Sequence, residues 1–226
     1  MKERFRNTFI DRSVKLKMER KARNKKPKTP SETNNTIHRQ AEIYQKALDL
    51  FVEKGYDATS MSMIAQALKM SKPNRYYYCP SKEELLYQIH LDDLQKRFIP
   101  ILDEAEKIRD PQARIAHFLR RLTLMCTASP AAQVLVHELR SLSKIHQRQI
   151  SVVWRRAYEI FRGAIKELQQ SGRGREGRES FLTFLGTGMA LWIVYWFNYS
   201  GQNHSEELAD LVTQVFLKGV LHPGRE

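Results

Sequence analysis

Residues 59–87 read TSMSMIAQALKMSKPNRYYYCPSKEELLY and predict two short helices joined by a tight turn, followed by a longer third helix. Ser60 precedes apolar residues at helical spacing, and its side chain can accept a hydrogen bond from the free N–H groups that begin a helix. Residues 69–71 form the turn, Ser71 can cap the second helix, and Pro73 lies in its first turn, where a missing N–H is tolerated. Two short helices with an exposed, polar second one are typical of a helix-turn-helix that places side chains in the DNA major groove.

The second helix is too polar and too aromatic to serve only as core. It carries Lys72, Asn74, Arg75, Tyr76, Tyr77 and Tyr78. Pro80 ends it, because proline lacks the N–H that a helix interior needs. Ser81 then begins the third helix as part of a capping box, in which its hydroxyl accepts one backbone N–H and Glu84 reaches back to another.

Together with the helix before it, this stretch resembles the N-terminal domain of the TetR family of bacterial transcriptional regulators. The resemblance covers residues 43–86 and rests on an ordered series of matches. These are the apolar helix ending in Glu53-Lys54-Gly55-Tyr56, then Ala58-Thr59-Ser60, Ile64-Ala65, Ser71-Lys72, Tyr76-Tyr77 and Pro80-Ser81-Lys82-Glu83. The resemblance implies an all-α fold, with an N-terminal three-helix DNA-binding domain that contains the helix-turn-helix and a C-terminal helical ligand-binding and dimerisation domain.

The DNA-binding residues that we predict form two groups. The phosphate contacts, at the start of the first short helix and after the second, are Thr59, Ser60, Ser62 and Lys82. The second helix contributes Ser71, Lys72, Asn74, Tyr76 and Tyr77, of which the last four should enter the major groove. Tyrosine hydroxyls there can touch phosphate, whereas Asn74 and Lys72 are better placed to read base edges.

Three positions depart from the family pattern. Lys69 stands where a turn glycine is usual, Arg75 where a leucine usually packs inward, and Cys79 where a phenylalanine is usual. Lys69 must therefore adopt a left-handed or strained backbone, at a cost of about 1–2 kcal/mol. Arg75 either extends out of the core or becomes an extra phosphate contact.

The composition favours a helical protein with a polyanionic partner. The chain has 226 residues, 38 Lys and Arg against 25 Asp and Glu, and only ten glycines and eight prolines. Basic charge alone does not separate nucleic acid from a membrane surface, but no run of about 18 apolar residues exists, so we expect no membrane span. The two cysteines are too few for a disulfide framework and indicate a reducing, cytoplasmic location.

Residues 1–36 form a separate basic region, with twelve Lys and Arg against four acids. Because residues 24–31 lack apolar periodicity, we expect a disordered extension. One interpretation is an arm that follows the DNA backbone or reaches a minor groove. The alternatives are a solvated tail, or a chain that truly starts at Met18.

The remaining chain divides into a DNA-binding domain over residues 37–82 and a ligand-binding and dimerisation domain over residues 83–226. Apolar spacing predicts helices over residues 37–54, 81–109 with a kink at Pro100, 111–129, 131–143, 144–171, 176–199 and 205–221. A long helix that leaves the DNA-binding domain is a plausible lever between the two domains.

Residues 181–199, FLTFLGTGMALWIVYWFNY, are the most apolar stretch, and they are apolar nearly all round. The resemblance implies that the last two helices pair with their copies in a homodimer, which would match a palindromic operator. Small residues would permit close approach at Gly186, Gly188 and Ala190, and the seam would continue through Leu208, Leu211, Val212, Val215, Phe216 and Val220. The alternative is the core helix of a monomer.

The second half also loosely resembles the TetR subgroup that responds to acyl-CoA or fatty acids. The similarity rests on Glu138-Leu139-Arg140-Ser141-Leu142, on Trp192 with Tyr195-Trp196, and on residues 205–210 and 216–219. The predicted pocket for an apolar effector is walled by Phe118, Leu122, Met125, Trp154, Met189, Trp192 and Trp196. Arg140, Arg155 or Arg156 could bind an anionic head group, whereas the alternative is that these aromatics are ordinary core or dimer seam.

Catalysis and metal binding find little support. The histidines and cysteines lack zinc spacing, no glycine-rich phosphate loop is present, and each Ser-Lys pair lies at an expected helix start, where capping explains it. We therefore predict that the protein is a transcriptional regulator and not an enzyme. We expect it to act as a repressor that a small hydrophobic ligand releases from its operator. Two other hypotheses remain open, namely a ligand-independent DNA-binding protein with a nucleoid or cell-division role, and a helical lipid or acyl-CoA carrier that has lost DNA binding.

Overall fold

The computed structural model describes residues 30–70, 80–200 and 204–221, and the side chains of these residues except 30–37. Within these ranges the regular structure is helical, apart from one isolated β-bridge between Gly174 and Leu221, and the all-α prediction is confirmed. The α-helices are α2 (Pro30–Lys54), α3 (Met61–Ala67), α5 (Lys82–Asp93), α6 (Ile99–Lys107), α7 (Pro111–Thr127), α8 (Ala131–His137), α9 (Lys144–Gln170), α10 (Glu179–Trp192) and α11 (Ser205–Val220). Shorter pieces are the π-helix Leu94–Phe98 and the 3-10 helices Glu138–Ser141 and Ile193–Tyr195.

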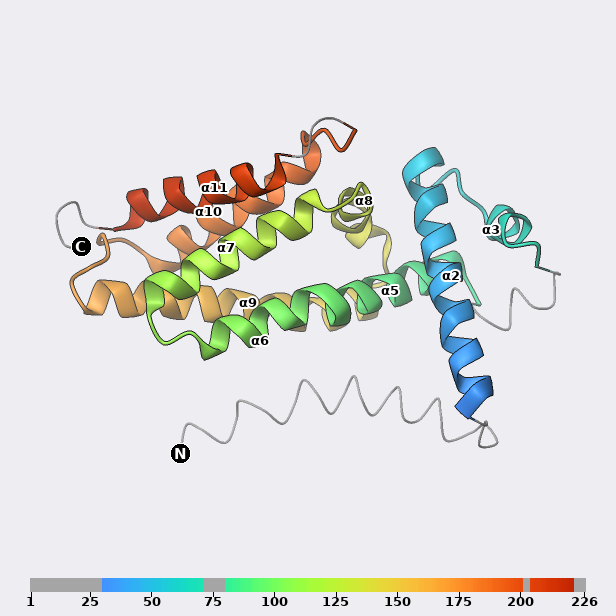
Figure 1. Cartoon of the computed structure of the whole chain (residues 1–226), viewed down its shortest axis with the longest axis horizontal. Coiled ribbons are helices and arrows are strands. Elements are labelled where there is room, and N and C mark those ends of the chain that lie inside the picture. Colours follow the sequence, from blue (N-terminus) through green and yellow to red (C-terminus); the bar gives the residue numbers. More distant parts are fainter. Residues whose placement is uncertain (1–29, 71–79, 201–203, 222–226) are drawn as a thin grey trace.

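The molecule consists of a small N-terminal part, α2 and α3, and an elongated bundle of the remaining helices, with α2 crossing the end of the bundle (Figure 1). A single cluster of buried apolar residues runs from Ile43 on α2 to Val220 on α11. The two parts therefore share a core, since α2 packs against α8 of the bundle.

Helix α2 starts earlier than its apolar pattern indicates. We predicted a start at residue 37, whereas the helix begins at Pro30. Proline is well suited to a first helical position, because its φ is already helical and its missing N–H has no partner there. Residues 1–29, with the predicted disordered arm, lie outside the described residues. At its other end α2 closes at Gly55, whose φ of +81° and N–H bond to the Phe51 carbonyl (3.0 Å) confirm the predicted C-cap.

The predicted long third helix changes pitch at its centre. α5 continues into α6 through a π-helical turn over Leu94–Phe98, where the Ile99 N–H donates to the Leu94 carbonyl. This turn directly precedes Pro100, whose missing N–H leaves an α-helical hydrogen bond unmade. The predicted disturbance at Pro100 is therefore a local π-turn inside one continuous helical rod (Figure 1).

α7 is the central helix of the bundle and packs against α6, α9, α10 and α11. A chain of aromatic rings crosses this core from Phe98 through Phe118 and Phe161 to Phe216, with ring centroids 5.3–6.4 Å apart. Gly186 on α10 lies against the last two rings, because a Cβ there would come within 2.8 Å of both Phe161 and Phe216. The prediction that Gly186 contacts a second subunit is therefore wrong.

Two predicted helices end earlier than expected. The segment 131–143 is α-helical only to His137 and finishes as a 3-10 turn, and the segment 176–199 is α-helical over Glu179–Trp192 before a 3-10 turn. Apolar periodicity alone does not distinguish an α-helical turn from a 3-10 turn, because over a single turn both place similar side chains on one face.

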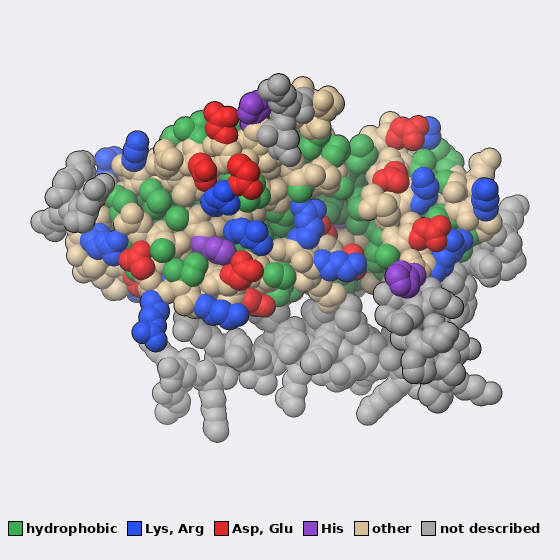
Figure 2. Space-filling view, viewed as in Figure 1, with side chains coloured by type: hydrophobic (Ala, Val, Ile, Leu, Met, Phe, Trp, Pro, Cys, Tyr) green, Lys and Arg blue, Asp and Glu red, His purple; other side chains and the backbone are tan. Residues whose placement is uncertain are grey.

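Acidic and basic side chains are interspersed on the face that α6, α7 and α11 present in Figure 2. Many of them pair across helices. Arg120 on α7 bonds Glu206 and Asp210 on α11, and His117 on α7 faces Glu104 on α6 at 3.3 Å. None of the described helices is both long and apolar enough to cross a membrane.

Candidate nucleic-acid interface and ligand cavity

The turn after α3 has the geometry that a helix-turn-helix needs. The Ser60 hydroxyl accepts the Met63 N–H at 3.2 Å and caps α3, as predicted. At the other end Met70 N–H reaches back to the Ala65 carbonyl (2.9 Å), and Lys69 has a φ of +52°. The prediction of a left-handed backbone at Lys69 is confirmed, so a lysine occupies a position where glycine would be free of strain.

The structure separates the predicted phosphate contacts. Ser60 and Ser62 are exposed on the first turn of α3, where a DNA backbone could reach them. Thr59 is buried, and its hydroxyl donates to the carbonyls of Leu50 (3.2 Å) and Gly55 (2.8 Å). Its side chain therefore holds the end of α2 in place, and the structure does not support it as a phosphate contact. The predicted groove residues Ser71, Lys72, Asn74, Tyr76 and Tyr77 lie outside the described residues.

Lys82 has a structural role in addition to its predicted phosphate contact. Its ammonium donates to the carbonyls of Tyr56 (2.7 Å) and Asp57 (3.2 Å) and lies 4.3 Å from the centroid of the Tyr56 ring. These contacts tie the first turn of α5 to the loop between α2 and α3. An ammonium has three N–H donors, so one remains for a phosphate beyond these two carbonyls.

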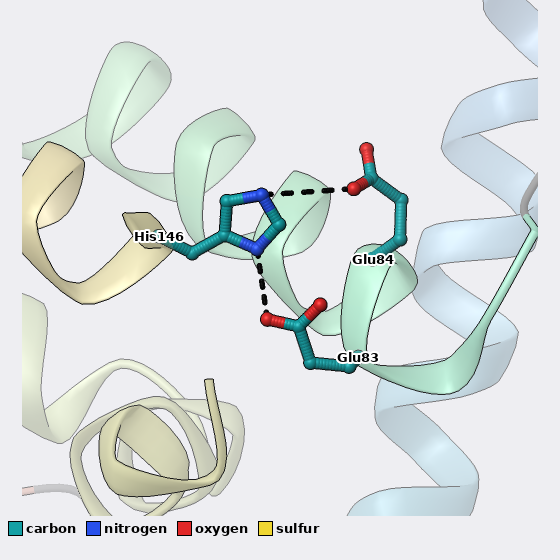
Figure 3. A group of neighbouring side chains, drawn as sticks. All are labelled: Glu83, Glu84 and His146. Atoms are coloured by element: carbon teal, nitrogen blue, oxygen red, sulfur yellow. Dashed lines mark hydrogen bonds and ion pairs between the residues drawn. The ribbon is translucent and has the colours of Figure 1, made fainter. Parts of the chain in front are cut away.

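A polar joint connects the start of α5 to the start of α9. The Ser81 hydroxyl caps α5 by accepting the Glu84 N–H at 3.0 Å. The first turn of α5 then carries the carboxylates of Glu83 and Glu84. The His146 ring lies between them, with Nδ1 2.8 Å from Glu83 and Nε2 3.7 Å from Glu84 (Figure 3). Glu83 also accepts the backbone N–H of Ser143 at 2.8 Å.

The same joint includes an aromatic contact one turn further along α5. The Tyr87 ring stacks on the His146 ring at 3.7 Å, nearly parallel, and its hydroxyl bonds the Gln149 side chain. The ligand atoms of Glu83, Glu84 and His146 lie within 4.8 Å of one another and could in principle hold a metal ion. Because each ring nitrogen already faces a carboxylate, we interpret the group as a hydrogen-bonded joint between two helices.

The bundle contains a partly open cavity of about 230 Å³. Its wall is mostly apolar and is assembled from α5, the π-turn, α7, α8 with the 3-10 turn that follows it, α9 and α10. The lining residues are His90, Asp93, Leu94, Arg97, Met125, Cys126, Ala132, Leu135, Val136, Leu139, Trp154 and Leu191. A mostly apolar concave space with few polar groups is typical of a small-molecule site.

The charged side chains of the cavity wall are Asp93 and Arg97, and His90 contributes an imidazole. Asp93 and Arg97 form an ion pair (3.0 Å), and Arg97 also donates to the Met125 carbonyl (2.6 Å). His90 is only 6% exposed, burial lowers its pKa to about 4, and its Nε2 has no hydrogen-bond partner among the described residues. A buried polar atom without a hydrogen-bond partner costs about 1–3 kcal/mol, so a bound molecule that makes a hydrogen bond to His90 would gain affinity.

Comparison with known protein families accounts for both parts of the chain. Residues 43–89 match the family model described as bacterial regulatory proteins, tetR family. Residues 109–220 match the model described as tetracyclin repressor-like, C-terminal domain.

The chain belongs to the TetR family.

Solved TetR-family structures share this fold over most of their length. PfmR from Thermus thermophilus is 28% identical, with a TM-score of 0.72 over 78% of this chain and 97% of that chain. AibR, solved in complex with isovaleryl coenzyme A and operator DNA, is 27% identical, with a TM-score of 0.71 over 78% of this chain and 97% of that chain. An uncharacterised HTH-type regulator of Bacillus subtilis, YuxN, is 37% identical over 83 residues, which are 37% of this chain and 28% of that protein. TetR-family membership makes the protein a DNA-binding transcriptional regulator and supports the prediction that it is not an enzyme.

Among the residues predicted for the ligand site of this TetR-family protein, the cavity includes Met125 and Trp154. Phe118 and Leu122 are buried in the neighbouring core, with Phe98 in contact with both Phe118 and Trp154. Met189 is half-buried and does not line the cavity.

The two other predicted tryptophans point away from the cavity. Trp192 and Trp196 are 63% and 56% exposed, so their assignment to the pocket is wrong. They lie on or near the end of α10, which is apolar on every side, and composition alone does not indicate which side of such a helix is inside.

The predicted arginines also lie outside the cavity. Arg140 and Arg155 are exposed, and Arg156 pairs with Asp103 and Glu106 on α6. The cavity arginine is Arg97, and we predicted neither this residue nor His90 and Asp93 for the ligand site. A signal was present, because His90 is four residues after Leu86 and four before Leu94, on the inward stripe of α5.

Loss of the Glu83 charge is expected to loosen the joint between α5 and α9. Burial alone would raise the pKa of Glu83, but the Ser143 N–H and His146 bond its carboxylate, so the pKa is held below the usual value. A carboxyl whose pKa is lowered by folding stabilises the fold at pH values above the usual pKa of glutamate. This contribution is lost as the pH falls through the pKa of the folded state. Glu83→Gln should therefore lower the free energy of unfolding by about 1–2 kcal/mol at pH 7, and the difference from wild type should shrink at pH 3.5. Urea unfolding at both pH values measures this, and an equal difference at both would contradict it.

Proposed function

We propose that this protein is a homodimeric repressor that leaves its operator when a small hydrophobic ligand occupies the cavity between the bundle helices. The observation that carries the proposal is the position of α5. This helix follows residues 71–79 of the helix-turn-helix by two residues, is joined to α9 through Glu83 and His146, and forms one wall of the cavity. AibR, a structural relative, was solved with both a small-molecule thioester and operator DNA, which supports the same division of roles here.

Release follows from a difference in affinity between two arrangements of the dimer. A ligand lowers operator affinity only if it binds the arrangement that does not fit the operator more tightly than the one that does. A molecule in the cavity contacts α5, α7, α8, α9 and α10 at once. It would therefore bias the position of α5 relative to α9. This would change the spacing between the two helices, one in each subunit, that are predicted to enter the major groove.

The dimer interface that we propose is an exposed apolar surface on α10 and α11. On α10 it comprises Phe181, Phe184, Leu185 and Trp192, and on α11 it comprises Leu211 and Val215, each at least half exposed. The α10 residues recur at helical spacing around Gly188, which has no atom within 4 Å of a Cβ position. Exposed apolar stripes on two neighbouring helices are typical of a subunit interface. Trp196 and Leu211 line a groove between the segment that follows the 3-10 turn Ile193–Tyr195 and α11, and burial of this groove in the dimer would also cover the exposed Trp196.

Three residues that we placed at this seam have a different role in the structure. Val212, Phe216 and Val220 are buried within the subunit, while Leu211 and Val215 carry the exposed side of α11. Residues 211 and 212 differ by about 100° around a helix, which is enough to move from the outer to the inner face.

Selection of bound sequences from a random DNA pool at near-physiological salt tests the DNA-binding part of the proposal. We expect an enriched palindrome, because a two-fold symmetric dimer presents two equivalent reading helices. Binding without enrichment would favour a ligand-independent architectural protein, and no binding would favour a carrier that has lost DNA recognition.

An Asn74→Ala variant tests the reading residue that the sequence indicates. Because bidentate contacts from asparagine discriminate adenine from other bases, we expect operator affinity to fall by about 10-fold or more with little change on random DNA. The measurement is a titration of both DNAs by fluorescence anisotropy. Equal weakening on both would show that Asn74 contacts only the backbone.

A further inference from the structure

We infer that the cavity takes a small, uncharged, mostly apolar molecule that carries one hydrogen-bonding oxygen, and that His90 Nε2 binds this oxygen. The inference rests on the proposed function and names the chemical class of its ligand. It excludes a charged head group, and it excludes a coenzyme A moiety, from the interior of the cavity.

The first step is the unpartnered nitrogen. His90 is almost fully buried on the inward side of α5, lines the cavity, and its Nε2 has no partner among the described residues. A neutral imidazole has one N–H donor and one acceptor nitrogen, and a ligand hydroxyl can satisfy either, whereas a carbonyl oxygen satisfies the N–H. The site therefore favours a ligand that places one oxygen within hydrogen-bond distance of His90 Nε2.

The second step is the charge of the cavity. Its two charges already balance each other, because one guanidinium nitrogen of Arg97 pairs with Asp93, while another donates to the Met125 carbonyl. An anionic ligand would have to compete with Asp93 for Arg97, and a cationic one would have to compete with Arg97 for Asp93. Since ion pairs inside proteins are costly to break, an uncharged ligand leaves this part of the wall intact.

The third step is size. The cavity of about 230 Å³ is smaller than the range of roughly 300–1,000 Å³ that is usual for drug-sized ligands. At about 30 Å³ for each water-sized group, it has room for at least eight or so non-hydrogen atoms. A chain of that length with one terminal or internal oxygen fits, and coenzyme A is several times too large.

The test uses the full-length protein without DNA, so that its result does not depend on operator release. The probes are 1-heptanol, 2-heptanone, heptanoate and heptanoyl-CoA, and the readouts are calorimetric affinity and the shift in melting temperature at saturation. We expect 1-heptanol and 2-heptanone to bind more tightly than heptanoate and heptanoyl-CoA. Tighter binding of heptanoate or heptanoyl-CoA would overturn the uncharged class while leaving a ligand-released regulator in place.

His90 is tested by three variants. His90→Leu should weaken 1-heptanol about 3- to 10-fold, which is the usual contribution of one hydrogen bond, and His90→Gln should restore most of the loss. His117→Leu is the matched control, because His117 lies on α7 outside the cavity and should leave the affinity unchanged. Equal affinity of wild type and His90→Leu would overturn the role of His90. Absence of binding by all four probes would overturn the cavity as a site for this class, and an operator titration would then show separately whether the protein is released at all.

Discussion

A Leu185→Glu variant should be a folded monomer that has lost most of its operator affinity. Leu185 is 63% exposed on α10, so a glutamate there stays hydrated in the free subunit and should change its stability by less than about 0.5 kcal/mol. In the proposed dimer the same position faces its symmetry copy, and each buried, unpaired carboxylate costs several kcal/mol. Loss of the second reading helix removes the advantage of two-site binding, and operator affinity should fall about 10²- to 10⁴-fold.

Sedimentation equilibrium and an operator titration measure the two parts of this result. Val152→Glu is the control, because it introduces the same charge at an exposed apolar position on α9, outside the surface on α10 and α11. A Leu185→Glu protein that remains dimeric with unchanged operator affinity would refute the proposed interface.

The second large effect is expected in the core, for Phe161→Ala. Phe161 on α9 is 1% exposed and lies between the rings of Phe118 and Phe216, at centroid distances of 5.3 and 5.5 Å. Truncation of a buried phenylalanine to alanine costs about 3–5 kcal/mol, because transfer energy is lost and a cavity remains. Total stabilities of about 5–15 kcal/mol are usual, so the variant should be marginally folded at 25 °C. Urea unfolding measures this, and Val152→Ala should change the midpoint little.

Gly186 provides a sharper test of the same packing. Its missing Cβ leaves room for the ring ends of Phe161 and Phe216, each 2.8 Å from where that atom would be. Gly186→Ala should therefore destabilise the fold by about 1 kcal/mol or more, although alanine favours a helix. Combined with Phe161→Leu, which removes one of these ring ends, the loss should be less than the sum of the two single losses. Strict additivity would contradict the contact.

These expectations separate two roles for α10. Its inner side, with Gly186 and Ala190, maintains the fold of one subunit, and its outer side, with Leu185 and Trp192, serves assembly. Core substitutions should therefore act on stability at any concentration. Substitutions on the outer side should act on affinity in a way that depends on protein concentration.

The sequence by itself determined the features that short segments make alone. The caps at Ser60 and Ser81, the helix end at Gly55 and the left-handed turn at Lys69 each depend on hydrogen bonds between residues no more than five positions apart. The family resemblance and the all-α fold depended on the same local signals. They could be predicted because local geometry allows few residue types at a cap or a left-handed turn.

Only the tertiary structure decided which apolar face meets which partner. The cavity combines side chains from several helices, so His90, Arg97 and Trp154 share a wall although Trp154 is far from the other two along the chain. The joint between Glu83 and His146 likewise connects residues 63 positions apart. Periodicity shows that a helix has an apolar side, but the packing of all helices together selects the neighbour of each side. For that reason Trp192 and Trp196, which belong to an all-apolar stretch, lie on the surface, while a histidine lies in the wall of the cavity.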